Sequence, residues 1–368
     1  MDSLMNLTSR LIDLAMQIQQ IPAPTFSEGA RAEFVRNLFE KEKLKDVSMD
    51  SLGNVYARLP GKQKKAKALV VSAHLDTVFP PSVSLQIRKE ADRIYAPGIG
   101  DNSIGVAALF GIIQSFHERG VKLGHDVWFV ANVGEEGLGD LRGMRGVVER
   151  FGGEVIGYLV LEGLALGHVY HRAIGVKRYR ITAKTAGGHS WSDYGQPSAV
   201  HELASLVTQL TSIRLPREPR TTMNVGTIHG GLNINSVPDR AVIGIDIRTI
   251  PAQSHAQIRE QLTSYLGRDV TLKTLLDAKS IWTDPHHPWI GEVFQVARDV
   301  EGVDDGLGAA PYFTDASALT PALGSPPTVI IGPGELALAH QTDEYCLVSR
   351  IERATEIYSQ LIRGWCGI

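Results

Sequence analysis

The chain has 368 residues, of which 43% are hydrophobic and 21% are charged, and its formal net charge is −3. A charge balance this even, without a long basic or acidic run, predicts neither a nucleic acid nor a membrane surface as partner. No apolar run reaches the roughly 18 residues of a transmembrane helix. The length exceeds what one hydrophobic core usually serves, so we expect two domains. Only Cys346 and Cys366 are present, which is too few for a disulfide scaffold and favours a reducing cytoplasm.

The first part of the chain alternates between helical and strand patterns. Leucines at helical spacing in residues 1–20 predict an amphipathic helix that lacks the pattern of a signal peptide. We expect helices near 3–20, 28–42, 103–119 and 141–151, and strands near 53–59, 67–73, 126–133 and 155–161. This alternation is typical of an α/β fold with a mostly parallel sheet and helices on both faces.

A second unit interrupts this alternation. Its expected elements are a strand (176–186), a helix (197–213), two strands (222–230 and 240–249), a helix (253–267) and a strand (269–275). The β-α-β-β-α-β order is the ferredoxin-like pattern. The α/β alternation then resumes with a helix near 290–300, a strand near 327–331 and a helix near 348–363. We therefore expect residues 174–278 to form an inserted α+β domain between the two parts, 1–173 and 279–368, of one α/β domain.

Acidic and histidine side chains follow the predicted strands. They are His74, Asp76, Asp101, Glu135, Glu136, Glu162 and His340. In parallel α/β sheets ligands bind beyond the carboxyl ends of the strands, where these residues would meet. Imidazole nitrogens and carboxylate oxygens are ligands that zinc takes in proteins. Two histidines and three carboxylates suit two zinc ions with one bridging carboxylate.

The neighbouring residues Glu135 and Glu136 are expected to do different jobs. Adjacent glutamates are common in solvated loops, but the other residues at the strand ends favour a metal site. Successive side chains of an extended segment point to opposite sides, so one glutamate can bind metal while the other faces a metal-bound water. Asp76 lies two residues after His74 and can accept the second N–H of the imidazole.

Seven motifs carry a resemblance to a known family. They are "SAHLDTV" (72–78), "GIGDNSIGVAAL" (98–109), "GEEG" (134–137), "LEG" (161–163), "GGHS" (187–190), "GGLNINSVPDRAVIGIDIRT" (230–249) and "AHQTDEY" (339–345). With these motifs the chain resembles the co-catalytic zinc exopeptidases and deacylases. That family includes glutamate carboxypeptidase, acetylornithine deacetylase, succinyl-diaminopimelate desuccinylase, aminoacylase and peptidase T. The motifs span nearly the whole chain in the family's order.

The resemblance assigns roles to the residues at the strand ends. It implies two zinc ions, for which Co²⁺ or Mn²⁺ can substitute, held by His74, Glu162, Glu136 and His340 and bridged by Asp101. Glu135 is then the general base, which takes a proton from the attacking water and passes it to the leaving nitrogen. Asp76 orients His74. The peptide bond between Asp101 and Asn102 is expected to be cis, with Asn102 where many relatives have Asp, Lys or Met.

The resemblance also assigns roles to the inserted domain. His189 matches a histidine that donates to the developing oxyanion, often from the partner subunit of a dimer. Arg248 matches an arginine that grips a substrate carboxylate, helped by Asn235, while Arg178 is a further candidate. The inserted domain is therefore expected to act as a lid and to form a homodimer. For His189 and Arg248 the alternatives are a surface imidazole and an exposed strand arginine.

Several alternatives stay open. The substrate is expected to be a small peptide or an N-acyl amino acid, and aminopeptidase action on short peptides is an alternative. A metal-free binding or scaffold protein is a second alternative, and a nicotinamide oxidoreductase is disfavoured because "GIGDNSIG" has Ser103 in place of the third glycine. Four further histidines are interpreted as loop or surface residues: His168, His171, His286 and His287.

Overall fold

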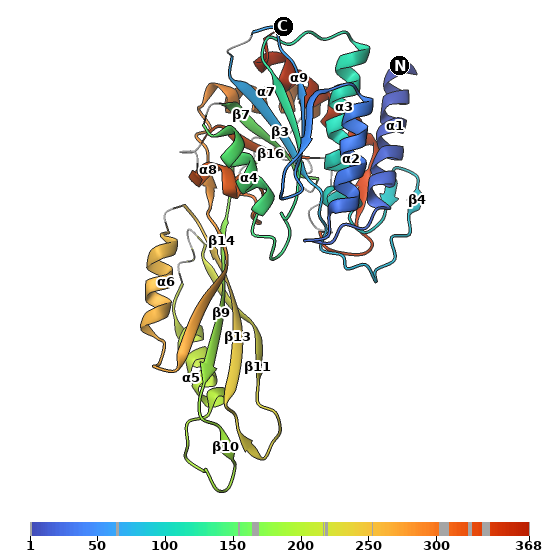
Figure 1. Cartoon of the computed structure of the whole chain (residues 1–368). Coiled ribbons are helices and arrows are strands. Elements are labelled where there is room, and N and C mark those ends of the chain that lie inside the picture. Colours follow the sequence, from blue (N-terminus) through green and yellow to red (C-terminus); the bar gives the residue numbers. More distant parts are fainter. Residues whose placement is uncertain are drawn as a thin grey trace. The chain divides into compact units, whose positions relative to one another are not determined.

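Figure 1 shows the computed structural model of the chain. The structure describes residues 2–63, 66–153, 155–163, 169–215, 217, 220–251, 253–301, 309–322, 326–332 and 339–367. The chain divides into two compact units. Unit 1 comprises Met1–Arg172, Ile281–Ala310 and Thr314–Ile368, and unit 2 comprises Ala173–Ser280 and Pro311–Phe313.

Unit 1 is built on a six-stranded sheet. Its strands, in their order across the sheet, are β1 (Lys45–Met49), β2 (Val55–Leu59), β6 (Val127–Asn132), β3 (Ala68–His74), β7 (Val155–Leu161) and β16 (Thr328–Ile331). Strands β6, β3, β7 and β16 are parallel to one another, whereas β2 pairs antiparallel with β6 and β1 pairs antiparallel with β2. The four parallel strands are apolar and almost wholly buried, because helices cover both faces of the sheet.

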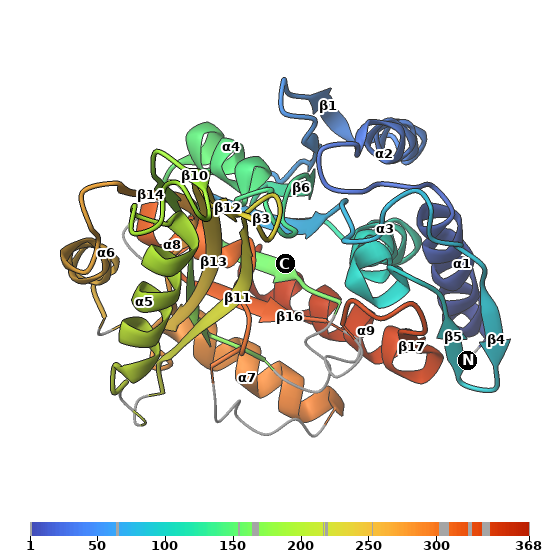
Figure 2. The same cartoon turned by 90° about the horizontal axis from the view of Figure 1, so that it is seen from below.

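The helices of unit 1 form a layer on each face. They are α1 (Asp2–Gln19), α2 (Gly29–Lys41), α3 (Ile104–Glu118), α4 (Arg142–Phe151), α7 (Pro288–Glu301), α8 (Ala316–Ala322) and α9 (Val348–Trp365). One core cluster joins residues of α1, α2, α3, α7 and α9 to alternate residues of the strands, such as Leu69 and Val71 of β3. Figure 2 shows α4 on the opposite side of the sheet from α7 and α9.

Among the described residues, one helical segment is long and apolar enough to cross a membrane, by length and composition alone. It is Ile99–Glu118, which contains a short helical turn, η1 (Ile99–Ser103), and α3. Of the most apolar part of this segment, 94% is buried inside the structure. The core position of this helix accounts for its apolar composition.

Short strands add two small sheets around unit 1. A three-stranded antiparallel sheet contains β17 (Tyr345–Leu347), β5 (Arg93–Tyr95) and β4 (Arg88–Glu90), and β8 (Arg172–Ala173) pairs with β15 (Ile281–Trp282). The pairing of β17 with β5 brings the segment after His340 beside the segment before Asp101.

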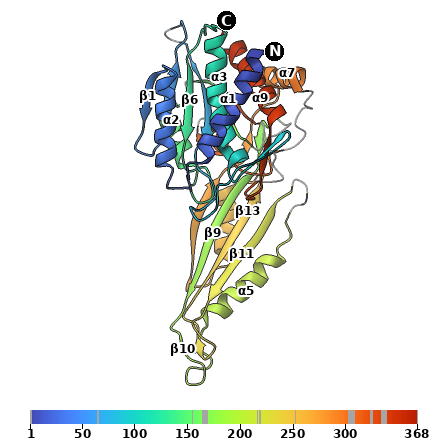
Figure 3. The same ribbon diagram turned by 90° about the vertical axis from the view of Figure 1, so that its right-hand side faces the viewer.

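Unit 2 has the β-α-β-β-α-β order that the sequence predicts. Its elements are β9 (Gly175–Lys184), β10 (Gly188–His189), α5 (Ala199–Ser212), β11 (Thr222–Gly230), β12 (Ser236–Val237), β13 (Arg240–Thr249), α6 (His255–Ser264) and β14 (Val270–Ala278). The antiparallel sheet has the order β11-β13-β9-β14, and β10 pairs with β12. Figure 3 shows α5 alongside this sheet. Ser198 and Ser254 cap α5 and α6, each by accepting the backbone N–H of the third residue of its helix.

Candidate metal centre

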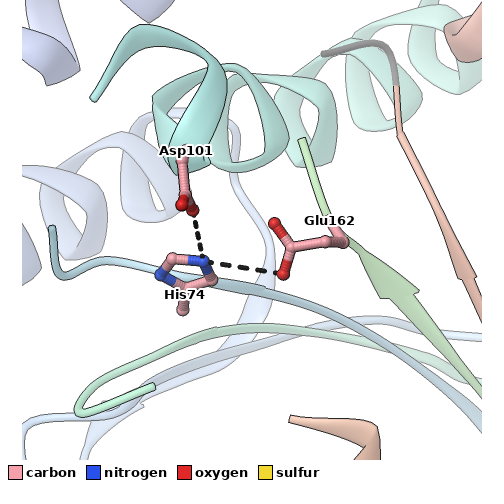
Figure 4. Close-up of side chains that lie close together, drawn as sticks. All are labelled: His74, Asp101 and Glu162. Carbon is pink, nitrogen blue, oxygen red and sulfur yellow. Dashed lines mark ion pairs between the residues drawn. The ribbon is translucent and has the colours of Figure 1, made fainter. Parts of the chain in front are cut away.

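Two histidines and three carboxylates meet at the carboxyl ends of the parallel strands. His74 is the last residue of β3, and Glu162 directly follows β7. Figure 4 shows these two side chains pointing toward Asp101, which lies in η1 just before α3. The Nε2 atom of His74 lies 3.1 Å from Oδ1 of Asp101 and 3.7 Å from Oε2 of Glu162.

A second group forms on the other oxygen of Asp101. The Nε2 atom of His340 lies 3.4 Å from Oδ2 of Asp101 and 3.3 Å from Oε2 of Glu136. In each group of three residues, one ligand atom per residue lies within 4.8 Å of the others. Asp101 belongs to both groups, which is the position that a bridging carboxylate needs.

The electrostatics of these side chains fit a site for divalent cations. Asp101, Glu136 and Glu162 are all buried, as is Glu135 beside them. Burial and the nearby Asp101 carboxylate raise the pKa of Glu136 to about 8, and burial also raises the pKa of Glu135. Oε1 of Glu136 accepts no hydrogen bond from the described residues. Buried carboxylates at this density are costly without a compensating charge, and a bound cation supplies that charge.

Asp76 fixes the segment Gly134–Gly137, here called the carboxylate loop, and also faces the imidazole of His74. Its backbone oxygen lies 3.1 Å from Nδ1 of His74, whereas its Oδ1 lies 3.7 Å away. The two carboxylate oxygens accept the backbone N–H groups of Glu135 at 3.0 Å and Glu136 at 2.9 Å. The side chain thus ties the end of β3 to the loop after β6, and the main chain makes the closer contact with the imidazole.

Glycines on both sides of the glutamate pair allow this loop to turn. Gly134 and Gly137 have φ values of 68° and 57°, a region that glycine enters without steric cost. A Cβ at Gly134 would also lie 2.0 Å from Nη1 of Arg142, so a side chain there would displace the arginine. The "GEEG" motif therefore reflects backbone geometry as well as the chemistry of its carboxylates.

The peptide bond between Asp101 and Asn102 is cis, as the resemblance predicts. The Asn102 side chain donates to the backbone oxygen of Leu161 at 2.9 Å and accepts the N–H of Gly163 at 3.0 Å. Asn102 therefore links the Asp101 segment to the two residues that flank Glu162.

Two buried carboxylates beside the centre were not predicted from the sequence. Oε1 of Glu344 accepts the N–H groups of Gly100 at 3.1 Å and Asp101 at 3.4 Å. Oδ2 of Asp315 accepts from the side chain of Asn132, the last residue of β6, at 2.7 Å. The only sequence signal for Glu344 is its place four residues after His340, and Asp315 follows no predicted strand.

Within unit 2, His189 lies in the short strand β10, and Asn235 directly precedes β12, with which β10 pairs. The backbone oxygen of Asn235 accepts the N–H of Ser190 at 3.0 Å, and both His189 and Asn235 are exposed. Nδ1 of His189 accepts the N–H of Trp191 at 3.2 Å. In a neutral imidazole this leaves the proton on Nε2, which is then a hydrogen-bond donor.

Arg178 and Arg248 lie on neighbouring strands and share one carboxylate. Nε of Arg178 donates to Oδ1 of Asp246 at 2.9 Å, and Nε of Arg248 donates to Oδ2 at 2.7 Å. Both guanidinium groups remain partly exposed. Asp246 therefore holds the two predicted substrate-binding arginines side by side.

His171 lies in a loop, as one of the two interpretations of the sequence predicts, but it is not a surface residue. His171 is buried, and its Nδ1 bonds to the backbone oxygen of Thr283 at 2.7 Å. It lies in a bend between Tyr170, which forms an isolated β-bridge, and β8, so no long apolar strand precedes it in the sequence. His286 is exposed and His287 half-buried in the loop before α7, while His168 lies outside the described residues.

Comparisons with known proteins identify the family. The model of peptidase family M20/M25/M40 matches residues 70–364. The chain is 23% identical over 397 residues to a probable succinyl-diaminopimelate desuccinylase of Staphylococcus aureus, covering 95% of this chain and 97% of that protein. It is 27% identical over 389 residues to a probable carboxypeptidase of Aspergillus clavatus, covering 96% and 88% respectively.

A solved structure shows the same fold. A tripeptidase of Staphylococcus aureus superposes with a TM-score of 0.79 at 19% identity, covering 97% of this chain and 99% of that one. The family model matches most of the chain, and all the candidate ligands, from His74 to His340, lie within the matched residues. The chain belongs to the peptidase family M20/M25/M40.

Proposed function

We propose that this protein is a di-zinc hydrolase that cleaves an amide or peptide bond next to a terminal amino acid, as an exopeptidase or an N-acyl-amino-acid deacylase. The observation that carries the proposal is the pair of ligand groups that share Asp101. His74 and Glu162 would hold one ion, Glu136 and His340 the other, and Asp101 both. The nitrogen and oxygen donor set suits zinc, with Co²⁺ or Mn²⁺ as substitutes.

The chain's own residues then divide the chemistry. Zinc bound at this centre would supply a Lewis acid that acidifies water and polarises the scissile carbonyl. Glu135 takes the proton of the attacking water and returns it to the leaving nitrogen. Asp76 fixes Glu135 and Glu136 through their backbone N–H groups, so that base and ligand keep their relative position. The buried surroundings strengthen each of these charge interactions.

Unit 2 is proposed to be the lid and substrate clamp. The N–H at Nε2 of His189 is suited to bind the developing oxyanion, and its exposure supports a role in contact with a ligand. Arg248 is proposed to bind a substrate carboxylate, with Asn235 and Arg178 in supporting roles. The pairing with Asp246 supports this proposal because it pre-orients both guanidinium groups.

Unit 2 is also proposed to form a homodimer. Strand β11 is one of the two edge strands of its sheet, and most of its side chains are exposed. Large apolar side chains are exposed on the nearby segments beside β10 and β12, among them Trp191 (86%) and Leu232 (89%). An open edge strand beside exposed apolar groups favours pairing across a two-fold axis.

The free state of Cys346 and Cys366 supports a reducing, cytoplasmic location.

Metal analysis and a substrate panel test the function. The protein, purified without chelator, is expected to contain two zinc ions per chain. The zinc-loaded protein is then incubated with dipeptides, tripeptides and N-acetyl amino acids, and mass spectrometry identifies the bond that is cut. Release of the carboxyl-terminal residue, the acyl group or the amino-terminal residue separates carboxypeptidase, deacylase and aminopeptidase action. Absence of zinc and of any cleavage would refute the proposal.

A further inference from the structure

Three large apolar side chains of unit 1 are exposed on loops that adjoin segments of the candidate metal centre. Phe26 is 62% exposed, Val78 36% and Leu138 55%. Val78 lies two residues after Asp76, and Leu138 lies two residues after Glu136. Single exposed apolar side chains are common on protein surfaces, but these three lie on segments that adjoin the proposed ligands and their supports, where an apolar part of a ligand can contact them.

Phe26 stands where its backbone favours another residue. The N–H of Ser27 donates to the backbone oxygen of Pro24 at 2.8 Å, which closes a turn with Phe26 in third position. Phe26 has a φ of 75°. A positive φ at this position is typical of type II turns, which favour glycine or asparagine there, and it is unfavourable for a bulky side chain. Since the ring is mostly exposed, core packing does not explain the phenylalanine.

The turn is fastened to the end of β3. The hydroxyl of Thr25 donates to Oδ2 of Asp76 at 3.0 Å, and the N–H of Thr77 donates to the backbone oxygen of Ala23 at 2.9 Å. Pro24 and Thr77 form an isolated β-bridge. Phe26 therefore directly follows Thr25, whose hydroxyl contacts Asp76, the residue that fixes Glu135 and Glu136.

The ring itself is also held in place. The Cζ atom of Arg142 lies 4.9 Å from the centre of the Phe26 ring, in a cation–π contact. Nη2 of Arg142 donates to both carboxylate oxygens of Glu28 at 2.9 Å. Arg142 also packs against Gly134, directly before Glu135. One face of the ring is thus fixed beside the carboxylate loop while most of its surface stays exposed, an arrangement suited to contact with a ligand.

We propose that Phe26, Val78 and Leu138 form an apolar rim that receives an apolar side chain of the substrate, next to the bond that is cut. The inference rests on the proposed function and adds a substrate class to it. Leucine-like side chains gain by burial against the rim, whereas acidic or very small side chains do not. The enzyme therefore prefers peptides or N-acyl amino acids with an apolar residue beside the scissile bond.

The first experiment measures side-chain preference in rim variants. Leucine, alanine and aspartate versions of N-acetyl amino acids, X-glycine and glycine-X dipeptides cover both sides of the bond. In the wild type we expect kcat/KM to be highest for leucine. Phe26→Ser is expected to lower the leucine-to-alanine ratio of kcat/KM by about 10–100-fold, and Val78→Ser and Leu138→Ser by about 3–10-fold, with unchanged zinc content. Met49→Ser is the matched control, because Met49 is also apolar and 37% exposed but lies in β1.

A binding measurement separates the rim from the reaction. Calorimetry measures binding of L-leucine, L-alanine and N-acetyl-L-leucine to the zinc-loaded wild type and to Phe26→Ser. If the wild type cleaves nothing but binds leucine about tenfold more tightly than alanine, and Phe26→Ser loses this difference, the rim stands and the proposed function fails. If the wild type cleaves leucine and alanine substrates equally and the variants change neither, the proposed function stands and the rim is refuted.

Two further measurements test the geometry of the rim. Phe26→Gly is expected to melt about 1–4 °C above Phe26→Ala, because glycine relieves the positive φ and alanine does not. A lower melting temperature for Phe26→Gly than for Phe26→Ala would contradict the argument that the backbone at position 26 is unfavourable for a side chain, and that phenylalanine is kept there for its role in the site.

Sedimentation velocity shows whether the rim instead contacts a second copy of the chain. Serine variants that weaken association and leave the leucine-to-alanine ratio unchanged would overturn the substrate assignment.

Discussion

Replacement of Glu344 by alanine tests whether a carboxylate outside the proposed ligand set fixes Asp101, the proposed bridging ligand. The side chain is 1% exposed, and its Oε1 accepts the N–H groups of Gly100 and Asp101. Glu344→Ala leaves these N–H groups without their acceptor, and one unpaired buried group costs about 1–3 kcal/mol of unfolding free energy. Loss of a residue that orients a metal ligand typically costs about 10–100-fold in metal affinity, and we expect a zinc Kd raised by this factor.

Glu344→Gln provides the matched control, since its amide oxygen can still accept both N–H groups. Zinc affinity is measured by competition with a chromophoric chelator, and stability by thermal unfolding of the metal-free proteins. We expect Glu344→Ala to lose both affinity and stability, and Glu344→Gln to recover most of the affinity. Excess zinc should restore kcat in Glu344→Ala. A variant that is less stable but binds both zinc ions as tightly as the wild type would refute the positioning role.

Other replacements test further parts of the argument. Glu135→Gln should keep both zinc ions and lower kcat by about 10²–10⁴-fold, whereas Glu136→Gln should weaken zinc binding. Metal analysis combined with kinetics checks both variants, and the opposite pattern would exchange the roles of the two glutamates. His189→Ala should lower kcat by about 10²–10³-fold at full zinc content, and Arg248→Ala should mainly raise KM. An unchanged kcat for His189→Ala at saturating substrate would refute the proposal that His189 binds the developing oxyanion. Burial opposes ionisation of Asp277, but hydrogen bonds with His255 and Lys177 hold its pKa at about 2, below the usual 3.8. Its stabilising effect is therefore present above about pH 4 and is lost as the pH falls toward 2, so the melting temperatures of Asp277→Asn and wild type should differ at pH 7 and converge near pH 2.

The parallel strands and the residues that follow them were predictable because their signals are local. Strand β6 (Val127–Asn132) is a continuous apolar run, and a chemically distinctive glutamate pair follows it. The same holds for β3 and His74. Strand β4 (Arg88–Glu90) had no such signal, because all three of its residues are exposed and charged. Its place is set by pairing with β5, which a periodicity in the sequence cannot reveal.

The residues that support the candidate centre were harder to predict than its proposed ligands. The sequence indicates that Asp76 can face His74, but the structure shows its carboxylate on the N–H groups of Glu135 and Glu136. Glu344 likewise binds backbone N–H groups. Any residue supplies a backbone N–H, so such a partner leaves no mark in the sequence, and only the fold shows where it lies.

The order of strands in the large sheet has a consequence for how the protein is synthesised. Strand β7 ends at Leu161, and its parallel partner β16 begins only at Thr328, after the whole of Ala173–Ser280. On the ribosome, one edge of β7 must therefore stay open until the inserted unit has been made, and unit 2 can fold first. An open apolar strand is a template for pairing with other chains. Changes that delay or weaken β16 should thus appear as aggregation of newly made protein before they appear as a defect in catalysis.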